Sequence, residues 1–250
     1  MQYDALNKNE NHNKIQENNM QTLKQFWQGF RLLPSAWLLL VQLALLILAM
    51  LTYGDSEFRA LTWSLGVLAL LIIAKVIRQT PVFTFWGLVF VSGAFLFSIL
   101  IFIGYSNLMI QIVAHSFEAL AYFYAAYGLL RYMFADRYLT KDELFAAGAV
   151  FTLIAWGFAF LYSICQLILP NSFQNPNQPQ ALQHWLDLLF LSFSLQSATG
   201  LSDLIPISPA ARVLAMLQMF GGVMYLAVVV SRLIALQYIA HAPKHSNDKE

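Results

Sequence analysis

A short polar turn, Ser197–Asp203, interrupts a strongly apolar part of this 250-residue sequence. It carries three hydroxyl side chains and one carboxylate, at Ser197, Thr199, Ser202 and Asp203. Oxygen atoms of these kinds attract cations, and a carboxylate in a low-dielectric setting concentrates them by its charge. The chemistry that this segment, called the polar turn below, could perform is therefore the attraction of cations.

An ionisable pair, His115 and Glu118, lies inside an apolar segment, where charged groups are costly. The spacing of three residues places both side chains on one face of a helix. The pair could sense protons or ions, because histidine titrates near neutral pH. The alternative is a polar contact with other helices, which the absence of a third ligand favours.

The sequence contains no arrangement typical of an enzyme or a metal centre. Two ionisable residues without a third ligand form neither a metal site nor a catalytic triad. The single cysteine, Cys165, lies in an apolar segment without a defined base, and we interpret it as a packing residue. We therefore predict no catalytic residue, no metal ion and no cofactor.

The composition indicates a polytopic membrane protein, because charged residues make up 11% of the chain against about 25% in soluble domains. The net charge of +1 identifies no partner, and we predict no nucleic-acid binding. The polar N-terminal residues lack the apolar core of a signal peptide. Six segments are long and apolar enough to span a bilayer, at 35–53, 61–77, 82–104, 108–130, 144–169 and 210–238.

The positions of the basic residues predict the orientation in the membrane. An even number of spans puts both termini on one side, and basic residues concentrate on the cytoplasmic side. Only Arg59 and Arg212 of the 14 basic residues fall on the opposite side. We therefore predict a multi-pass protein of the cell membrane, in bacteria the inner membrane, with both termini cytoplasmic and the polar turn outside.

The apolar run Trp185–Leu195 has only half of the about 20 residues that a spanning helix needs. It is predicted to dip into the membrane and turn back, because irregular backbone at membrane depth must be shielded by protein or line water. The expected fold is an all-α membrane protein with six transmembrane helices. A re-entrant pore helix and filter loop would lie between helices five and six.

The chain divides into four predicted regions. Residues 1–20 are too polar to bury a core and are expected to form a disordered cytoplasmic tail. Residues 21–138 would form an amphipathic helix, or a plain extension of the first span, and a peripheral four-helix unit; residues 139–240 would form the pore domain, and 241–250 a second tail. The fourth span ends in a single basic residue, Arg131, which predicts no voltage sensing.

From about Leu139 the sequence resembles the bacterial potassium-channel-like pore-domain family, or ion channel family. In that family a filter T-V-G-Y-G-D precedes a proline pair and an inner helix containing G-Q-L-Y-L-A-V-x-x-A-R-L. The matching positions are Phe193 ahead of the filter, then Gly200, Asp203, Pro206, Ser208, Pro209, Ala211 and Arg212, then Gly222, Tyr225, Leu226, Ala227, Val228, Arg232 and Leu233. The resemblance implies that residues 197–203 form the ion filter of a homotetramer.

The sequence departs from the family where selectivity is made. Ala198 and Leu201 lack the hydroxyls of the family's threonine and tyrosine, and Ser202 replaces a glycine whose positive φ a serine adopts poorly. Behind the filter, Gln218 and Val223 replace an acidic residue and a glutamine. These changes imply a weak preference between potassium and sodium.

The segment 210–238 contains two further sites of interest. Adjacent glycines, Gly221 and Gly222, could be a gating hinge, because they weaken a helix, or could permit close packing against the pore helix. Val228, Val229 and Leu233 are candidates for a hydrophobic constriction at the cytoplasmic end.

The sequence therefore predicts a homotetrameric channel for monovalent cations, K⁺ or Na⁺ or both, that is not voltage-gated. In a four-fold assembly Asp203 would form an acidic ring near the outer mouth. The predicted partners are copies of the chain, the lipid bilayer and inorganic cations. The alternative is a pseudo-channel that no longer conducts and acts as a regulatory or assembly subunit, which the changed filter would also permit.

Overall fold

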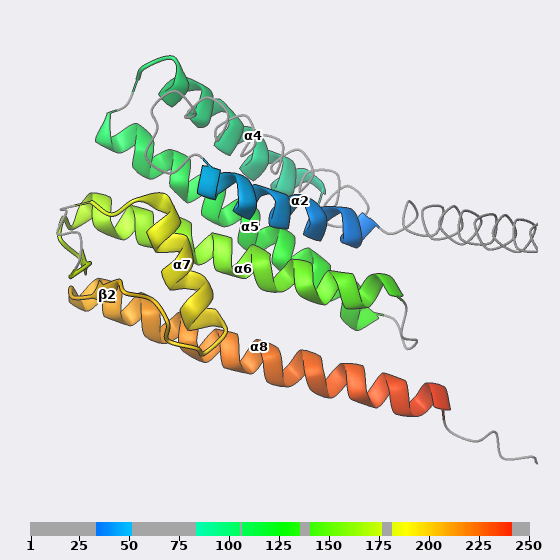
Figure 1. The fold of residues 1–250 in the computed structure, drawn as a ribbon. Helices are drawn as coiled ribbons and strands as arrows, with labels where there is room; N and C mark the ends of the chain where they lie inside the picture. The colour runs from blue at the N-terminus through cyan, green and yellow to red at the C-terminus, as the bar shows by residue number, and fades with distance from the viewer. Residues whose placement is uncertain (1–33, 52–83, 106, 136–140, 177–181, 242–250) are drawn as a thin grey trace, which may run out of the picture.

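The structure of this protein, a computed structural model, describes residues 34–51, 84–105, 107–135, 141–176 and 182–241. Within these ranges the chain forms α2 (Pro34–Leu51), α4 (Thr84–Phe102), α5 (Leu108–Ala135), α6 (Lys141–Ile168), β1 (Phe173–Gln174), α7 (Trp185–Gln196), β2 (Ile205–Pro206) and α8 (Pro209–His241) (Figure 1). The second predicted span, 61–77, lies outside the described residues. So do residues 1–33 and 242–250, which hold the predicted tails and nearly all of the predicted amphipathic helix.

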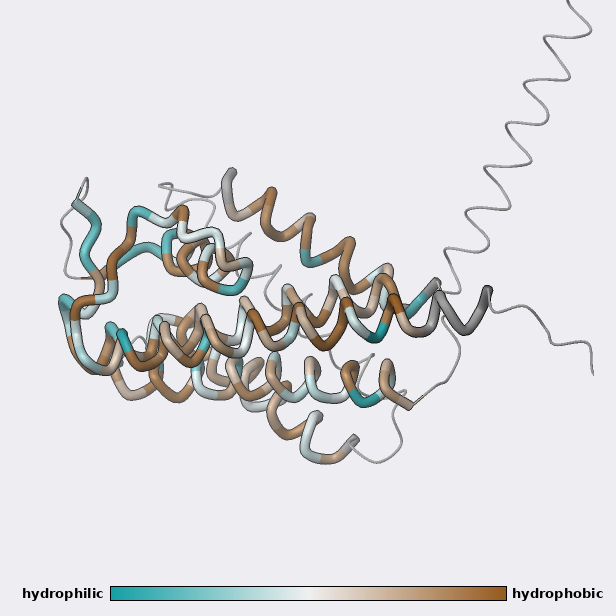
Figure 2. The backbone as a smooth tube through the Cα atoms, turned by 90° about the horizontal axis from the view of Figure 1, so that it is seen from below, coloured by the Kyte–Doolittle hydropathy of each residue, from teal (hydrophilic) through white to brown (hydrophobic). Residues whose placement is uncertain are grey.

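Four of the described helices are long and apolar enough to cross a membrane, with apolar spans at Phe85–Phe102, Leu108–Ala135, Asp142–Ile168 and Pro209–Ala235. The apolar part of α2, Ser35–Ala49, is shorter. Hydrophobic residues follow the helices along most of their length, and hydrophilic residues gather at the end where the loops lie (Figure 2). The four long spans agree with four of the predicted segments to within a few residues.

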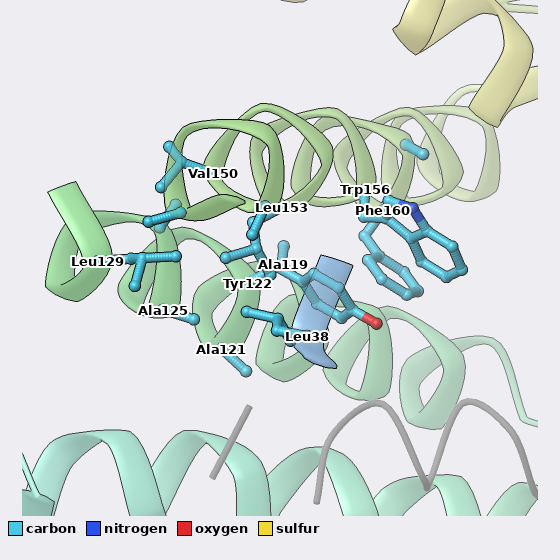
Figure 3. Packing of buried hydrophobic residues seen from close by; sticks show 14 of the residues in the cluster. Leu38, Ala119, Ala121, Tyr122, Ala125, Leu129, Val150, Leu153, Trp156 and Phe160 are labelled. Carbon is cyan, nitrogen blue, oxygen red and sulfur yellow. The ribbon is translucent and has the colours of Figure 1, made fainter. Parts of the chain in front are cut away.

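Small residues on α5 allow the helices to approach each other closely, as in many membrane helix bundles. Ala121 and Ala125 of α5 are buried, and the rings of Tyr122 and Trp156 stack with centroids 5.8 Å apart (Figure 3). Leu38 of α2 packs into the same cluster. This core joins α2, α4 and α5 to α6, the first long helix of the predicted pore domain.

The short helix α7 lies between α6 and α8 (Figure 1). Leu188 and Leu191 of α7 are almost fully buried in a second cluster with Tyr162 of α6 and Ala215 of α8. α7 has 12 residues and begins after His184, which makes no side-chain capping bond. It ends where the polar turn begins, as the predicted apolar run Trp185–Leu195 requires.

A two-stranded antiparallel ribbon joins the loop after α6 to the segment before α8, with Phe173 paired to Pro206 and Gln174 to Ile205. The Ser172 carbonyl also accepts a hydrogen bond from the Ile207 amide at 2.8 Å. The loop after α6 is rich in Asn, Gln and Pro, residues that are usually exposed, yet Ser172, Phe173 and Gln183 are buried. The reason is that the ribbon anchors this loop to the segment that leaves the polar turn.

Two buried polar contacts tie α2 to α6. The Asp142 carboxylate accepts hydrogen bonds from the amide and the hydroxyl of Ser35, at 3.2 and 2.9 Å. Further along the same two helices, the Thr152 hydroxyl of α6 donates to Gln42 Oε1 of α2 at 2.6 Å. Because unpaired polar groups are costly away from water, these contacts set the register of α2 on α6.

Candidate functional site

The polar turn is held by the last turn of α7. The carbonyl of Ser194 accepts hydrogen bonds from the amides of Thr199 and Gly200, at 3.0 and 3.3 Å. The hydroxyl of the same serine accepts the amide of Ser202 at 3.1 Å. One buried side chain and its carbonyl therefore turn three amides of the polar turn toward α7.

The carbonyl groups of the polar turn are used differently from its amides. Within the described part of the chain, the carbonyls of residues 198–201 accept no hydrogen bond, and residues 198–201 are exposed. Backbone carbonyls that are not used inside the fold can coordinate a cation in place of its water shell. The amides of the turn are thus used inside the fold, whereas these carbonyls have no donor among the described residues.

Two residues of the polar turn have left-handed backbone conformations, Ala198 with φ 58° and Gly200 with φ 64°. We expected strain at Ser202, where the resembling family has a glycine, but Ser202 has no positive φ. Its hydroxyl instead accepts the amide of Leu204 at 3.1 Å, which stabilises a local turn. The strained residue is Ala198, and left-handed backbone at an alanine costs about 1–2 kcal/mol.

The side chains of the polar turn that could attract or exclude cations are accessible. Asp203 is exposed, and among the described residues it takes part in no ion pair. Leu201 is 71% exposed, so this residue does not brace the turn from behind. The hydroxyls of Ser197 and Thr199 lie 3.0 Å apart and bond to α7 carbonyls, at 2.7 Å to Phe193 and 3.3 Å to Ser194.

A buried hydrogen-bonded cluster lies behind the polar turn. We call it the Gln218 network, and it consists of Tyr162, Ser192, Gln196 and Gln218. Tyr162 belongs to α6, Ser192 and Gln196 to α7, and Gln218 to α8. The network therefore joins three helices at the level of the last turn of α7.

Gln218 stands out in the sequence as a departure from the family, whereas Ser192, Ser194 and Gln196 were not among the predicted site residues. A signal for them exists, because all three are polar residues inside the short apolar run that forms α7. Ser192 and Gln196 are four residues apart and so share a helix face, which the structure turns toward α8.

Gly222 lies against the end of α7. A Cβ atom at this position would come within 2.6 Å of the Gln196 carbonyl oxygen and 3.0 Å of its Cα. A Cβ at Gly221 would meet nothing within 4 Å, and α8 is helical through both residues. Close packing therefore accounts for Gly222, while a hinge at this position stays a prediction.

The three residues predicted to form a cytoplasmic constriction do not share one environment. Val228 is 45% exposed. Val229 is 5% exposed within the first core cluster, and Leu233 packs against that cluster. Of the three, Val228 is thus the side chain placed on an exposed face of α8.

His115 and Glu118 meet as the helical spacing predicts. The two side chains are 2.8 Å apart, and the Ser98 hydroxyl of α4 donates to the same carboxylate at 3.2 Å. The imidazole also lies beside Phe160 of α6, with ring centroids 5.8 Å apart. The pair thus contacts both neighbouring helices, and a sensing role stays a prediction.

Toward the C-terminal end of α8, Arg232 joins this helix to two further helices. Its guanidinium donates to the Met133 carbonyl of α5 and lies 4.8 Å from the Phe134 ring centroid. Its Nη2 atom is 3.9 Å from Glu143 Oε1, a carboxylate with a 2% exposed side chain at the start of α6. This contact connects α5 and the start of α6 with the C-terminal part of α8.

Among the residues that the structure describes, no group of three or more His, Cys, Asp or Glu side chains could hold a metal ion. Cys165 is buried and free within the second core cluster. Its environment is apolar, in agreement with a packing role.

Comparison with known protein families finds a match in the C-terminal half of the chain. Residues 147–237 match the family described as "Ion channel". The matched segment runs through most of α6, all of α7 and the polar turn, and most of α8. No curated protein and no solved structure matches the chain significantly.

Proposed function

We propose that this protein, which carries an ion-channel domain over residues 147–237, is a cation channel whose filter is the polar turn. The observation that carries the proposal is the division of backbone groups in that turn. Three amides bond to Ser194, whereas the carbonyls of residues 198–201 are used by no donor in the described chain. A filter that replaces an ion's water shell with carbonyl oxygens requires this arrangement.

The proposed working unit is a homotetramer, because one polar turn supplies only one side of a closed ion path. In the single chain, large apolar side chains of α8 are exposed near the level of the turn, including Met216, Leu217 and Phe220. A four-fold assembly would cover part of this surface with neighbouring copies and leave the rest to lipid. The full chain would then contribute six spans with both termini cytoplasmic.

The proposed channel passes monovalent cations with little discrimination between K⁺ and Na⁺. Leu201 is exposed and has no hydroxyl with which to brace the turn, and Ala198 offers no side-chain oxygen. Without these hydroxyls, the carbonyl oxygens of the turn are held less firmly at the distance that suits one kind of ion. The proposal includes no voltage gating, since the sequence of α5 contains one basic residue, Arg131.

Purified protein reconstituted in liposomes is expected to carry a cation flux, measured with K⁺ and Na⁺ on opposite sides of the membrane. The reversal potential is expected to lie close to zero, because the two ions permeate to similar extents. A strongly K⁺-selective reversal potential would contradict the proposed filter. No flux at any potential, pH or membrane tension would instead support the alternative, a non-conducting regulatory or assembly subunit, which the altered filter residues would also permit.

Asp203→Asn is expected to lower single-channel conductance for monovalent cations and to weaken block by divalent ions. The reason is that an exposed carboxylate, repeated four times, concentrates cations at the mouth. The effect should shrink at high salt, because ions screen exposed charges. Asp203→Glu is the matched control and should retain most of the conductance; equal conductance of wild type and Asp203→Asn would place this carboxylate away from the ion path.

A further inference from the structure

The Gln218 network has a fixed hydrogen-bond direction. The Ser192 hydroxyl donates to the Ala155 carbonyl at 2.6 Å, so toward Gln218 its oxygen can only accept. The Tyr162 hydroxyl donates to Gln218 Oε1 at 2.5 Å. The opposite end of this side chain must therefore donate, which an amide can do and a carboxylate cannot.

Three acceptors surround the donating end of Gln218. Its Nε2 atom lies 2.6 Å from the Ser192 hydroxyl, 3.0 Å from the Ser192 carbonyl and 3.3 Å from Gln196 Oε1. Because an amide nitrogen carries two hydrogens, these acceptors share them. The longest of the three contacts leads to Gln196, the residue that precedes the polar turn.

The network is sealed from solvent. Tyr162, Ser192, Gln196 and Gln218 are all 0% exposed. A buried hydrogen bond that is lost there cannot be replaced by one to bulk water. Any movement of α8 relative to α7 therefore breaks or stretches these bonds.

Gln196 contacts α8 at two points. Its side chain accepts from Gln218, and its backbone carbonyl oxygen lies 2.6 Å from the position that a Cβ of residue 222 would take. Two residues upstream, Ser194 holds the three amides of the polar turn. The position of α8 is thus transmitted through one turn of α7 to the backbone that presents the carbonyls.

We propose that Gln218 is a positioning residue that sets the geometry of the polar turn, and through it the ratio of K⁺ to Na⁺ permeability. The proposal rests on the proposed channel function for its second part only. Its first part concerns the backbone of the turn and can be measured in a protein that does not conduct.

The test compares Gln218→Met with Gln42→Met, which also removes a buried amide but acts on the contact of α2 with Thr152. Tyr162→Phe removes one oxygen from the network and serves if Gln218→Met fails to assemble. Both glutamine variants are expected to lower thermal stability. Only the variants of the network are expected to change the polar turn.

Hydrogen exchange of the Thr199, Gly200 and Ser202 amides is the first measurement. Exchange is expected to accelerate about threefold to tenfold in Gln218→Met, the equivalent of one neutral hydrogen bond, and to stay unchanged in Gln42→Met. Unchanged exchange at these amides in both network variants would overturn the positioning role, whether or not the protein conducts.

The second measurement is the permeability ratio from reversal potentials. Gln218→Met and Tyr162→Phe are expected to shift it by about threefold or more, while Gln42→Met leaves it at the wild-type value. Faster exchange with an unaltered ratio would overturn the link to selectivity. A wild-type protein without cation flux would contradict the proposed function and leave the exchange result to decide the positioning role.

Discussion

Gly222→Ala is expected to displace α8 from the end of α7 and to abolish cation flux. The added methyl group would lie 2.6 Å from the carbonyl oxygen and 3.0 Å from the Cα of Gln196. Backbone atoms cannot rotate away as a flexible side chain can, so either α8 or the end of α7 must move. Overpacking of this kind costs about 1–3 kcal/mol, and the displaced segment leads directly into the polar turn.

Gly221→Ala is the matched control, because a Cβ there meets no atom within 4 Å. Alanine is about 1 kcal/mol more favourable than glycine inside a helix, so this variant should be as stable as wild type or more stable. Thermal unfolding in detergent and liposome flux measure both variants. Equal stability of the two would show that α8 does not approach Gln196 closely, whereas lost flux in a stable Gly221→Ala protein would support a hinge.

Arg232→Leu is expected to destabilise the protein by about 3–5 kcal/mol and to loosen the end of α8 from α5. The variant removes the cation beside the Glu143 carboxylate, whose side chain is 2% exposed, and the donor to the Met133 carbonyl. Loss of one member of a buried ion pair costs this much because the other charge stays buried. Chemical or thermal unfolding of the reconstituted protein gives the free-energy change.

Arg212→Leu is the control for the loss of an arginine from the same helix, since Arg212 is exposed and its side chain bonds to the Pro206 carbonyl. Its effect should be below about 0.5 kcal/mol, as for most surface substitutions. The double variant Arg232→Leu/Glu143→Gln should recover part of the loss, because the buried carboxylate is then neutral. Strictly additive effects would mean that Arg232 and Glu143 do not interact.

The sequence does not determine which residues of the predicted hinge and constriction pack against other helices. The helix α8 is apolar on nearly every face, as is common for a helix surrounded by protein and lipid. Such a pattern does not tell which face meets α6. Only the packing shows that Val229 faces the core, that Val228 does not, and that Gly222 touches α7.

The backbone conformation of the polar turn was likewise not determined by the residue types alone. Comparison of residue types predicted a strained backbone at Ser202, where the family has a glycine. The structure places the left-handed non-glycine residue of the turn at Ala198, because the amides of residues 199, 200 and 202 bond to a single serine of α7. The path of the backbone follows these contacts rather than the residue types alone.

The sequence by itself determined the membrane class, four of the long apolar helices, the length of α7, the His115–Glu118 pair and the location of the polar turn. These features depend on composition and on periodicity within single segments, which neighbouring helices do not alter. The tertiary structure decided how the polar turn is held: by Ser194, by the Gln218 network and by the contact of Gly222 with Gln196. The physical reason is that these contacts join residues of different helices, and the faces that meet are selected by packing between helices whose apolar surfaces are alike.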